Sequence, residues 1–131
     1  MAQASYPEDL LYHAEHDWAR IEADGSTATL GITWYAQDAL GEVVFFEPPQ
    51  VGARLTQGEP YAEIESVKAV SDVVAPLSGE IVEVNQGLAE DPQAINEDPY
   101  GAGWLVKARL SEASEHEALM DADAYIATLG G

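Results

Sequence analysis

The chain has 131 residues, enough for one domain with a single hydrophobic core and too few for a second sizeable one. Apolar residues make up 47% of it, which argues against whole-chain disorder in spite of a formal net charge of −19. This negative charge disfavours binding to nucleic acids and to anionic membrane surfaces, and it favours partners with basic patches. The chain contains no cysteine, which excludes disulfides, thiol nucleophiles and dithiol redox chemistry of its own. Any redox chemistry must be borrowed from a group that is not one of the chain's own side chains.

Membrane insertion and export are not expected from the sequence. No apolar run approaches the ~20 residues that cross a bilayer. Residues 1–9 lack both a basic start and an apolar stretch, so no signal peptide is expected.

Short apolar or alternating segments, broken by Gly, Pro, Asn or Asp, predict a mainly β fold. The expected strands, in chain order, are 18–22, 27–32, 43–47, 61–65, 73–75, 79–84 and 104–110. Asp24 and Gly25, between the first two strands, form a strong hairpin-turn signal. A similarity between 58–64 and 79–84 suggests two related strand units, as in a flattened barrel or a sandwich.

Helix signals are confined to four short segments, each defined by its ends. They are a helix 34–40 capped by Thr33 and stopped by Gly41, a turn from Asp91–Pro92 to Asn96, a capping box of Ser114 with Glu117, and a helix 122–129 capped by Asp121 and closed by Gly130–Gly131. We therefore expect one domain over 1–131, with a β core at about 12–110 and a C-terminal helical segment at 111–131. The five acidic residues of that segment suit a solvated face.

The chain has two lysines, in different surroundings. Lys107 falls in an alternating strand and is expected to point outward. Lys68 falls at the predicted turn between two strands, where an ordinary lysine would be a solvated turn residue balanced by Glu65 and Asp72. Apolar neighbours are unusual in such a turn, and here they indicate a lysine presented for docking.

The sequence around Lys68 resembles the lipoyl-attachment region of the glycine cleavage H-protein family. The matching runs are ESVKAVSD at 65–72 and APLSGE at 75–80. Three further stretches agree with that family in its order: His16–Trp18, 31–45 and 84–105. The resemblance extends over most of the chain, from about Tyr12 to Tyr125.

Two glycines agree with the spacing of lipoyl and biotinyl domains. Gly52 lies about sixteen positions before Lys68 and Gly79 about eleven after it, where the resemblance implies tight backbone geometry around the hairpin. Biotin carriers flank their lysine with methionine, whereas here the neighbours are Val67 and Ala69. Lipoyl domains of 2-oxoacid dehydrogenases are shorter and lack the C-terminal helices.

The resemblance implies a barrel-sandwich hybrid fold and a carrier function. Lys68 would be amide-linked to lipoic acid, and Glu65 would help the lipoylating enzyme to recognise the hairpin. The implied partners are a pyridoxal-phosphate glycine decarboxylase, a tetrahydrofolate-dependent aminomethyltransferase and an FAD- and NAD-dependent dihydrolipoyl dehydrogenase. The carrier would pass an aminomethyl group between the first two and electrons to the third. It would have no catalytic residues and no metal, and we expect a monomer in a bacterial cytoplasm; a mature mitochondrial form would share these sequence features.

Two departures from the family pattern lie away from the lysine. Trp34 stands where the family usually has an acidic residue, and Phe46-Glu47-Pro48-Pro49 replaces a more common Val-Glu-Leu-Pro type of run. Trp34 is expected to affect the surface groove that shelters the loaded arm.

Other functions are weaker alternatives. They include a lipoyl carrier for another complex, a lipoate relay between enzymes and an unmodified acidic binding adaptor. A Schiff-base lysine would require a buried pocket rather than a hairpin tip. His13 and His16 among acids are more often surface residues than metal ligands. Ser66, Ser71 and Ser78 lack the Gly-x-Ser-x-Gly context of a hydrolase.

Overall fold

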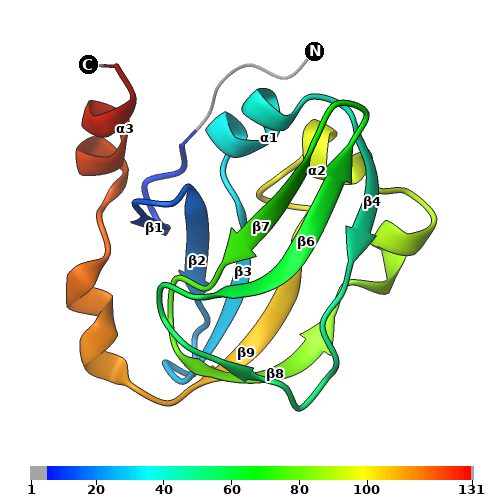
Figure 1. The fold of residues 1–131 in the computed structure, drawn as a ribbon. Helices are drawn as coiled ribbons and strands as arrows, with labels where there is room; N and C mark the ends of the chain where they lie inside the picture. The colour runs from blue at the N-terminus through cyan, green and yellow to red at the C-terminus, as the bar shows by residue number, and fades with distance from the viewer. Residues whose placement is uncertain (1–5, 131) are drawn as a thin grey trace.

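The computed structural model describes residues 6–130; residues 1–5 and Gly131, the second glycine of the expected helix stop, lie outside the described residues. Nine strands in the described range form two sheets, in the orders β1-β2-β3-β9-β8-β5 and β4-β6-β7 (Figure 1). The strands are β1 (Leu11–His13), β2 (Asp17–Ile21), β3 (Thr27–Ile32), β4 (Val43–Glu47), β5 (Arg54–Leu55), β6 (Pro60–Ser66), β7 (Val70–Val74), β8 (Gly79–Val84) and β9 (Val106–Leu110). The prediction of a mainly β fold of two sheets is confirmed.

The β2–β3 hairpin follows the predicted turn. Asp24 Oδ1 accepts hydrogen bonds from the backbone N–H groups of Ser26 and Thr27, both at 2.9 Å, and Gly25 has a φ of 74°. The turn sets a register in which Trp18 lies opposite Gly31. A Cβ atom at Gly31 would come within 2.6 Å of the Trp18 ring, so the glycine makes room for the indole.

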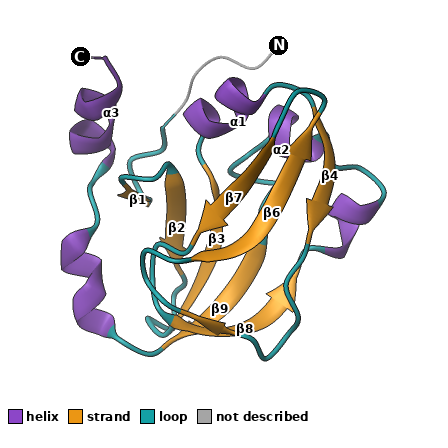
Figure 2. Cartoon of the chain, viewed as in Figure 1, coloured by secondary structure: helices purple, strands orange, loops and turns teal. Residues whose placement is uncertain are grey.

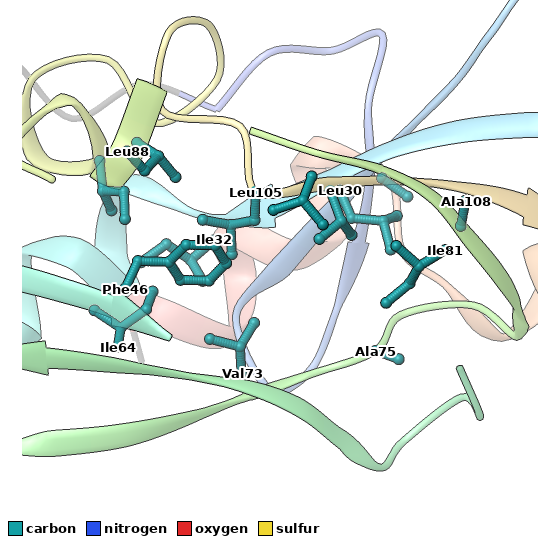
Figure 3. Packing of buried hydrophobic residues seen from close by; sticks show 14 of the residues in the cluster. Leu30, Ile32, Phe46, Ile64, Val73, Ala75, Ile81, Leu88, Leu105 and Ala108 are labelled. Atoms are coloured by element: carbon teal, nitrogen blue, oxygen red, sulfur yellow. The ribbon is translucent and has the colours of Figure 1, made fainter. Parts of the chain in front are cut away.

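The hydrophobic core lies between the two sheets. Alternation along each strand turns one set of side chains inward. Figure 3 shows Leu30 and Ile32 from the larger sheet, together with Leu105 just before β9, facing Phe46 and Ile64 from the smaller sheet. All five of these side chains are buried. Burial of such apolar surface is the main force that stabilises the fold against the repulsion of its negative charges.

Two strands were not predicted, and one predicted strand is shorter in the structure. β1 and β5 have three and two residues, which is too short to show a period in sequence. β9 begins at Val106 rather than at Trp104, because the Trp104 carbonyl accepts a side-chain hydrogen bond from Asn85 at 2.7 Å. β6 and β7 extend one and three residues further toward their shared turn than expected.

Short helices lie around the two sheets (Figure 2). They are α1 (Trp34–Leu40), the 3-10 helix η1 (Gln86–Ala89), α2 (Ala94–Glu97), the 3-10 helix η2 (Ala113–Ala118) and α3 (Ala122–Gly130). The α1 prediction is confirmed: Thr33 Oγ1 accepts from Ala36 N at 3.3 Å, and Gly41 ends the helix with a φ of 82°. No helix in the described range has the length and apolar character needed to cross a bilayer.

Of the three remaining helix signals, two are confirmed and one is wrong. The predicted turn from Asp91–Pro92 is present, since Ala94 N donates to Asp91 O at 3.2 Å and Ile95 N donates to Pro92 O at 3.1 Å, and it leads into α2. The capping box of Ser114 with Glu117 does not form, because η2 already begins at Ala113 and has no side-chain cap. The Asp121 cap of α3 is confirmed by a 2.8 Å hydrogen bond from Ala124 N to Asp121 Oδ1.

A second hydrophobic cluster holds α3 against β1. Tyr125 of α3 is fully buried and its ring stacks on that of Tyr12, with centroids 4.8 Å apart. Tyr12 and Met120 exchange two backbone hydrogen bonds of 2.8 Å each. The C-terminal segment is therefore packed on the sheet by its own cluster of buried side chains.

Candidate functional site

Lys68 lies at the tip of the β6–β7 hairpin, as the sequence predicted. β6 ends at Ser66 and β7 begins at Val70, so Lys68 is the middle residue of a three-residue connection. Its side chain is exposed, and so are those of Val67 and Val70 on either side. Figure 1 shows this hairpin beside α1.

The backbone of the tip is fixed by Ser66. Its hydroxyl is buried and accepts hydrogen bonds from the backbone N–H groups of Lys68 at 3.3 Å and Ala69 at 3.1 Å. Ser66 N donates to Ala69 O at 2.8 Å, and Val67 N donates to Glu42 O at 3.1 Å. These bonds satisfy the turn's backbone locally, so the lysine is presented on a rigid support.

The aliphatic part of Lys68 passes over the end of α1. A Cβ atom placed on Gly41 would lie 3.5 Å from Lys68 Cε. Asn96 supports this point: its amide nitrogen donates to Gly41 O and its amide oxygen accepts from Val43 N, both at 2.8 Å.

A groove of about 340 Å³ runs next to the hairpin, between α1 and β7. Its lining combines apolar side chains with three carboxyl groups. The residues are Glu15, His16, Asp17, Ile32, Tyr35, Ala36, Ala39, Leu40, Ile64, Ala69, Val70, Ser71, Asp72 and Val73. Because Ala69 directly follows Lys68, an extended group on the lysine starts at the mouth of this groove.

Asp17 places a buried carboxyl group in the groove lining. Its side chain is 2% exposed, and Oδ2 has no hydrogen-bond partner among the described residues. Burial, and to a lesser degree the charge of Glu15, raises the pKa of Asp17 well above its ordinary value. The Tyr61 hydroxyl is also buried without a partner, and burial followed by the charge of Asp17 raises the pKa of Tyr61. Such a carboxyl group can pair with a cationic group that enters the groove.

The sequence did not single out Asp17 as a site residue. Its place at the start of a β-strand next to Trp18 gave no sign of burial, because a strand-end aspartate is usually solvated. The carboxyl group becomes notable only when the groove brings it close to the hairpin.

His16 lines the groove, and among the described residues it is not part of a group of metal-binding side chains. Its Nδ1 lies 2.8 Å from the Tyr125 hydroxyl, and His13 Nδ1 accepts from Glu15 N at 3.0 Å. Within residues 6–130 no three His, Asp or Glu side chains are grouped as a metal site.

The other predicted site residues lie in different places. Glu65 is exposed in β6 and pairs in register with Phe45 and Val70. Gly52 has a φ of 95°, in the loop before β5. Gly79 begins β8, where a Cβ atom would lie 2.1 Å from Arg109 O. Both glycines therefore lie outside the β6–β7 hairpin itself.

Trp34, which was expected to affect the groove, is half-buried and is not among the residues that line it. The outward direction predicted for Lys107 is confirmed, because Val106 and Ala108 on the opposite face of β9 are buried. Lys107 is not freely solvated: it is half-buried, with its Nζ atom 5.4 Å from the centroid of the Trp104 ring.

Comparisons with known proteins agree on one family. The family model described as "Glycine cleavage H-protein" matches residues 10–130. A "Glycine cleavage system H protein" from Halorhodospira halophila is 51% identical and covers 91% of each chain, and one from Rubrobacter xylanophilus is 58% identical over 83% of this chain and 85% of the relative. The crystal structure of a glycine cleavage system H protein from Mycobacterium marinum is 40% identical and superposes with a TM-score of 0.82, covering 95% of this chain and 99% of the other.

Proposed function

The chain belongs to the glycine cleavage H-protein family, the lipoyl carriers of the glycine cleavage system, and on that premise we propose that Lys68 is its lipoyl-attachment residue. The observation that carries this proposal is the exposed lysine on a hairpin tip whose backbone is held by Ser66. A carrier that visits several active sites needs such a rigid support, since a mobile loop would lose orientation at each docking event.

The residues around Lys68 fit a lipoyl group. Lipoate supplies the disulfide that takes up an aminomethyl group and electrons, which this cysteine-free chain lacks. The apolar part of the groove, with Ile32, Leu40 and Ile64 in its lining, suits a hydrocarbon chain. The groove is continuous with the hairpin through Ala69 and Val70.

We propose that Asp17 neutralises the amine of the carried group when the modified side chain lies in the groove. An ammonium ion next to a buried carboxyl group without a full set of partners would form a charge-assisted hydrogen bond. Glu15 and Asp72, which also line the groove, would add to the negative potential.

The remaining site residues have proposed roles in support. Glu65, exposed in β6 three residues before Lys68, would be recognised by the lipoylating enzyme. Gly52 and Gly79 would keep the backbone geometry of the sheet that backs the hairpin, as their φ angle and close contact respectively suggest.

The partners we propose are the glycine decarboxylase, the aminomethyltransferase, the dihydrolipoyl dehydrogenase and the lipoylating enzyme. The chain would be a non-catalytic component, because its lysine and groove hold a reactive group while the bond-making residues belong to the partner enzymes. Its charge of −19 favours a monomer and fast encounter with basic surfaces. A cytoplasmic location is proposed from the bacterial relatives.

We propose that residues 1–131 act as one carrier domain, with a β core at about 12–110 and a C-terminal helical segment at 111–131. The support is the contact of Tyr125 with Tyr12, which joins α3 to the first strand.

The test of Lys68 is intact mass and peptide mapping after reaction with a purified lipoylating enzyme and lipoate. A lipoyl increment confined to the peptide that carries Lys68, absent in Lys68→Arg and retained in Lys107→Arg, is expected. An unmodified chain would contradict the proposal and leave an acidic adaptor. Loading of the lipoylated chain by a glycine decarboxylase would then separate this carrier from one that serves another complex or relays lipoate.

A further inference from the structure

One residue of the groove lining has an unfavourable backbone conformation. His16 has a φ of 75°, and it is the one non-glycine residue with a positive φ in the part of the chain that the structure describes. A residue with a Cβ atom adopts this conformation only where its surroundings hold it there.

Contacts on both sides hold His16 in place. Its backbone N–H donates to His13 O at 2.9 Å, and its carbonyl accepts from Thr33 N at 3.1 Å. Its ring lies against Tyr35, with centroids 4.6 Å apart, and its Nδ1 is 2.8 Å from the Tyr125 hydroxyl. Tyr35 also lines the groove, so the position of the His16 ring helps to define the groove wall.

The Tyr125 hydroxyl belongs to a chain of hydrogen bonds. It lies 2.7 Å from Thr33 Oγ1, which accepts from Ala36 N in the first turn of α1. Burial lowers the pKa of His16 and raises that of Tyr125, so the ring is neutral and the phenol protonated at neutral pH. Every hydroxyl hydrogen is then used if Thr33 donates to Tyr125 and Tyr125 donates to His16 Nδ1.

We propose that Tyr125 is a positioning residue for the groove. Through one hydroxyl group, the C-terminal helix holds both His16 and the first turn of α1, and each contributes to the groove lining. His16 and α1 thereby keep the spacing at which the groove retains the modified side chain of Lys68. This inference rests on the proposed lipoyl-carrier function and gives α3 a part in it.

The hydroxyl contact is separable from the packing of α3. The Tyr125 ring stacks on Tyr12 and also contacts the Tyr6 ring edge-on, at a centroid distance of 5.6 Å. Ala122 is buried in the same cluster, and Met120 is bonded to Tyr12 through the backbone. Removal of the hydroxyl alone should therefore leave the helix docked while it frees the His16 ring.

The test compares Tyr125→Phe with Tyr12→Phe. Tyr12 lies in the same cluster, but its hydroxyl donates to Pro7 O at 2.7 Å, and Pro7 does not line the groove. The first readout uses the unmodified chain: the ¹⁵N shifts of the His16 ring and the amide shifts of Tyr35 and Ser71, on the two sides of the groove. Tyr125→Phe should move all three sets, and Tyr12→Phe should move none of them.

The second readout uses the lipoylated protein after an aminomethyl group has been loaded on one lipoyl sulfur and all partner enzymes have been removed. When this group is exposed, water cleaves its carbon–sulfur and carbon–nitrogen bonds, which releases formaldehyde and ammonia and restores the thiol with no change in oxidation state. The loss of a hydrogen bond in Tyr125→Phe should speed formaldehyde release about fivefold. Tyr12→Phe should release it at the rate of the parent chain.

The outcomes separate this inference from the proposed function. Release from Tyr125→Phe at the parent rate, or an equal increase in both variants, would overturn the role of Tyr125 alone. A parent chain that the lipoylating enzyme leaves unmodified at Lys68 would overturn both the proposed function and this role.

Discussion

Ser78 and Glu115 are joined by two hydrogen bonds of 2.7 Å: the backbone N–H of Ser78 donates to Glu115 Oε1, and its hydroxyl donates to Oε2. This pair ties η2 to the residue that precedes β8. Gln57 adds to the junction, because its side chain donates to Glu115 O at 3.3 Å and its backbone N–H donates to Ser78 Oγ at 2.9 Å. The composition of the acidic C-terminal segment suggested a solvated face. Glu115 of this segment is instead bonded to Ser78 and Gln57.

Glu115→Ala should lower the free energy of unfolding by about 1–3 kcal/mol, because it leaves two partly buried donors of Ser78 without their acceptor. Urea unfolding followed by circular dichroism measures the effect. Glu117→Ala is the matched control, since Glu117 is exposed in the same helix and should stay within about 0.5 kcal/mol of the parent. Equal effects of the two substitutions would show that the Ser78 contact contributes nothing.

The sequence predicted the elements that have strong local signals. The strands at 27–32, 43–47 and 79–84 were predicted with their observed bounds, because each has a clear apolar pattern between turn residues. The α1 helix was also predicted correctly, since Thr33 and Gly41 mark both of its ends.

Elements decided by distant contacts could not be predicted. η2 has no side-chain cap of its own, and its Glu115 bonds to Ser78, 37 positions earlier in the chain. The groove carboxyl of Asp17 and the bond between His16 and Tyr125 likewise depend on how separate segments pack. The position of Lys68, in contrast, follows from the hairpin pattern alone.

Gly79→Ala should be strongly destabilising, by about 3 kcal/mol, because its Cβ atom would lie 2.1 Å from the backbone oxygen of Arg109 and the β8–β9 pairing would have to shift. Gly52→Ala should cost less, about 1–2 kcal/mol, since that site has open space and only its φ of 95° is unfavourable. Thermal unfolding of both variants gives the comparison. A milder effect at Gly79 than at Gly52 would contradict the close approach of β9.

Ser66→Ala should slow lipoylation of Lys68 without unfolding the protein. The substitution removes the acceptor for the backbone N–H groups of Lys68 and Ala69, so the hairpin tip becomes less ordered. We expect kcat/KM of a purified lipoylating enzyme to fall about fivefold for this substrate. Ser111→Ala, at an exposed serine outside the hairpin, should leave the rate unchanged. A parent-like rate for Ser66→Ala would mean that the enzyme orders the tip itself.

Asp17 should make the stability of the protein depend on pH with a definite sign. Burial raises its pKa in the folded state above the ordinary value of 3.8, so the folded protein holds this proton more tightly than the unfolded chain does. Stability from this group is therefore greatest below pH 3.8 and is lost as pH rises through the folded-state pKa. An asparagine side chain cannot ionise, so the Asp17→Asn variant does not lose this stability as pH rises. Its free energy of unfolding relative to the parent should therefore increase with pH.

Urea unfolding at several values between about pH 4 and about pH 8 tests this directly. The expected result is a difference between Asp17→Asn and the parent that grows steadily in favour of the variant. Asp38→Asn, at an exposed carboxyl group on α1, controls for the change in net charge. A difference that stays constant over this range would show that the Asp17 carboxylate is not desolvated in the folded state. The groove would then lack the buried charge that we propose for pairing with a carried amine.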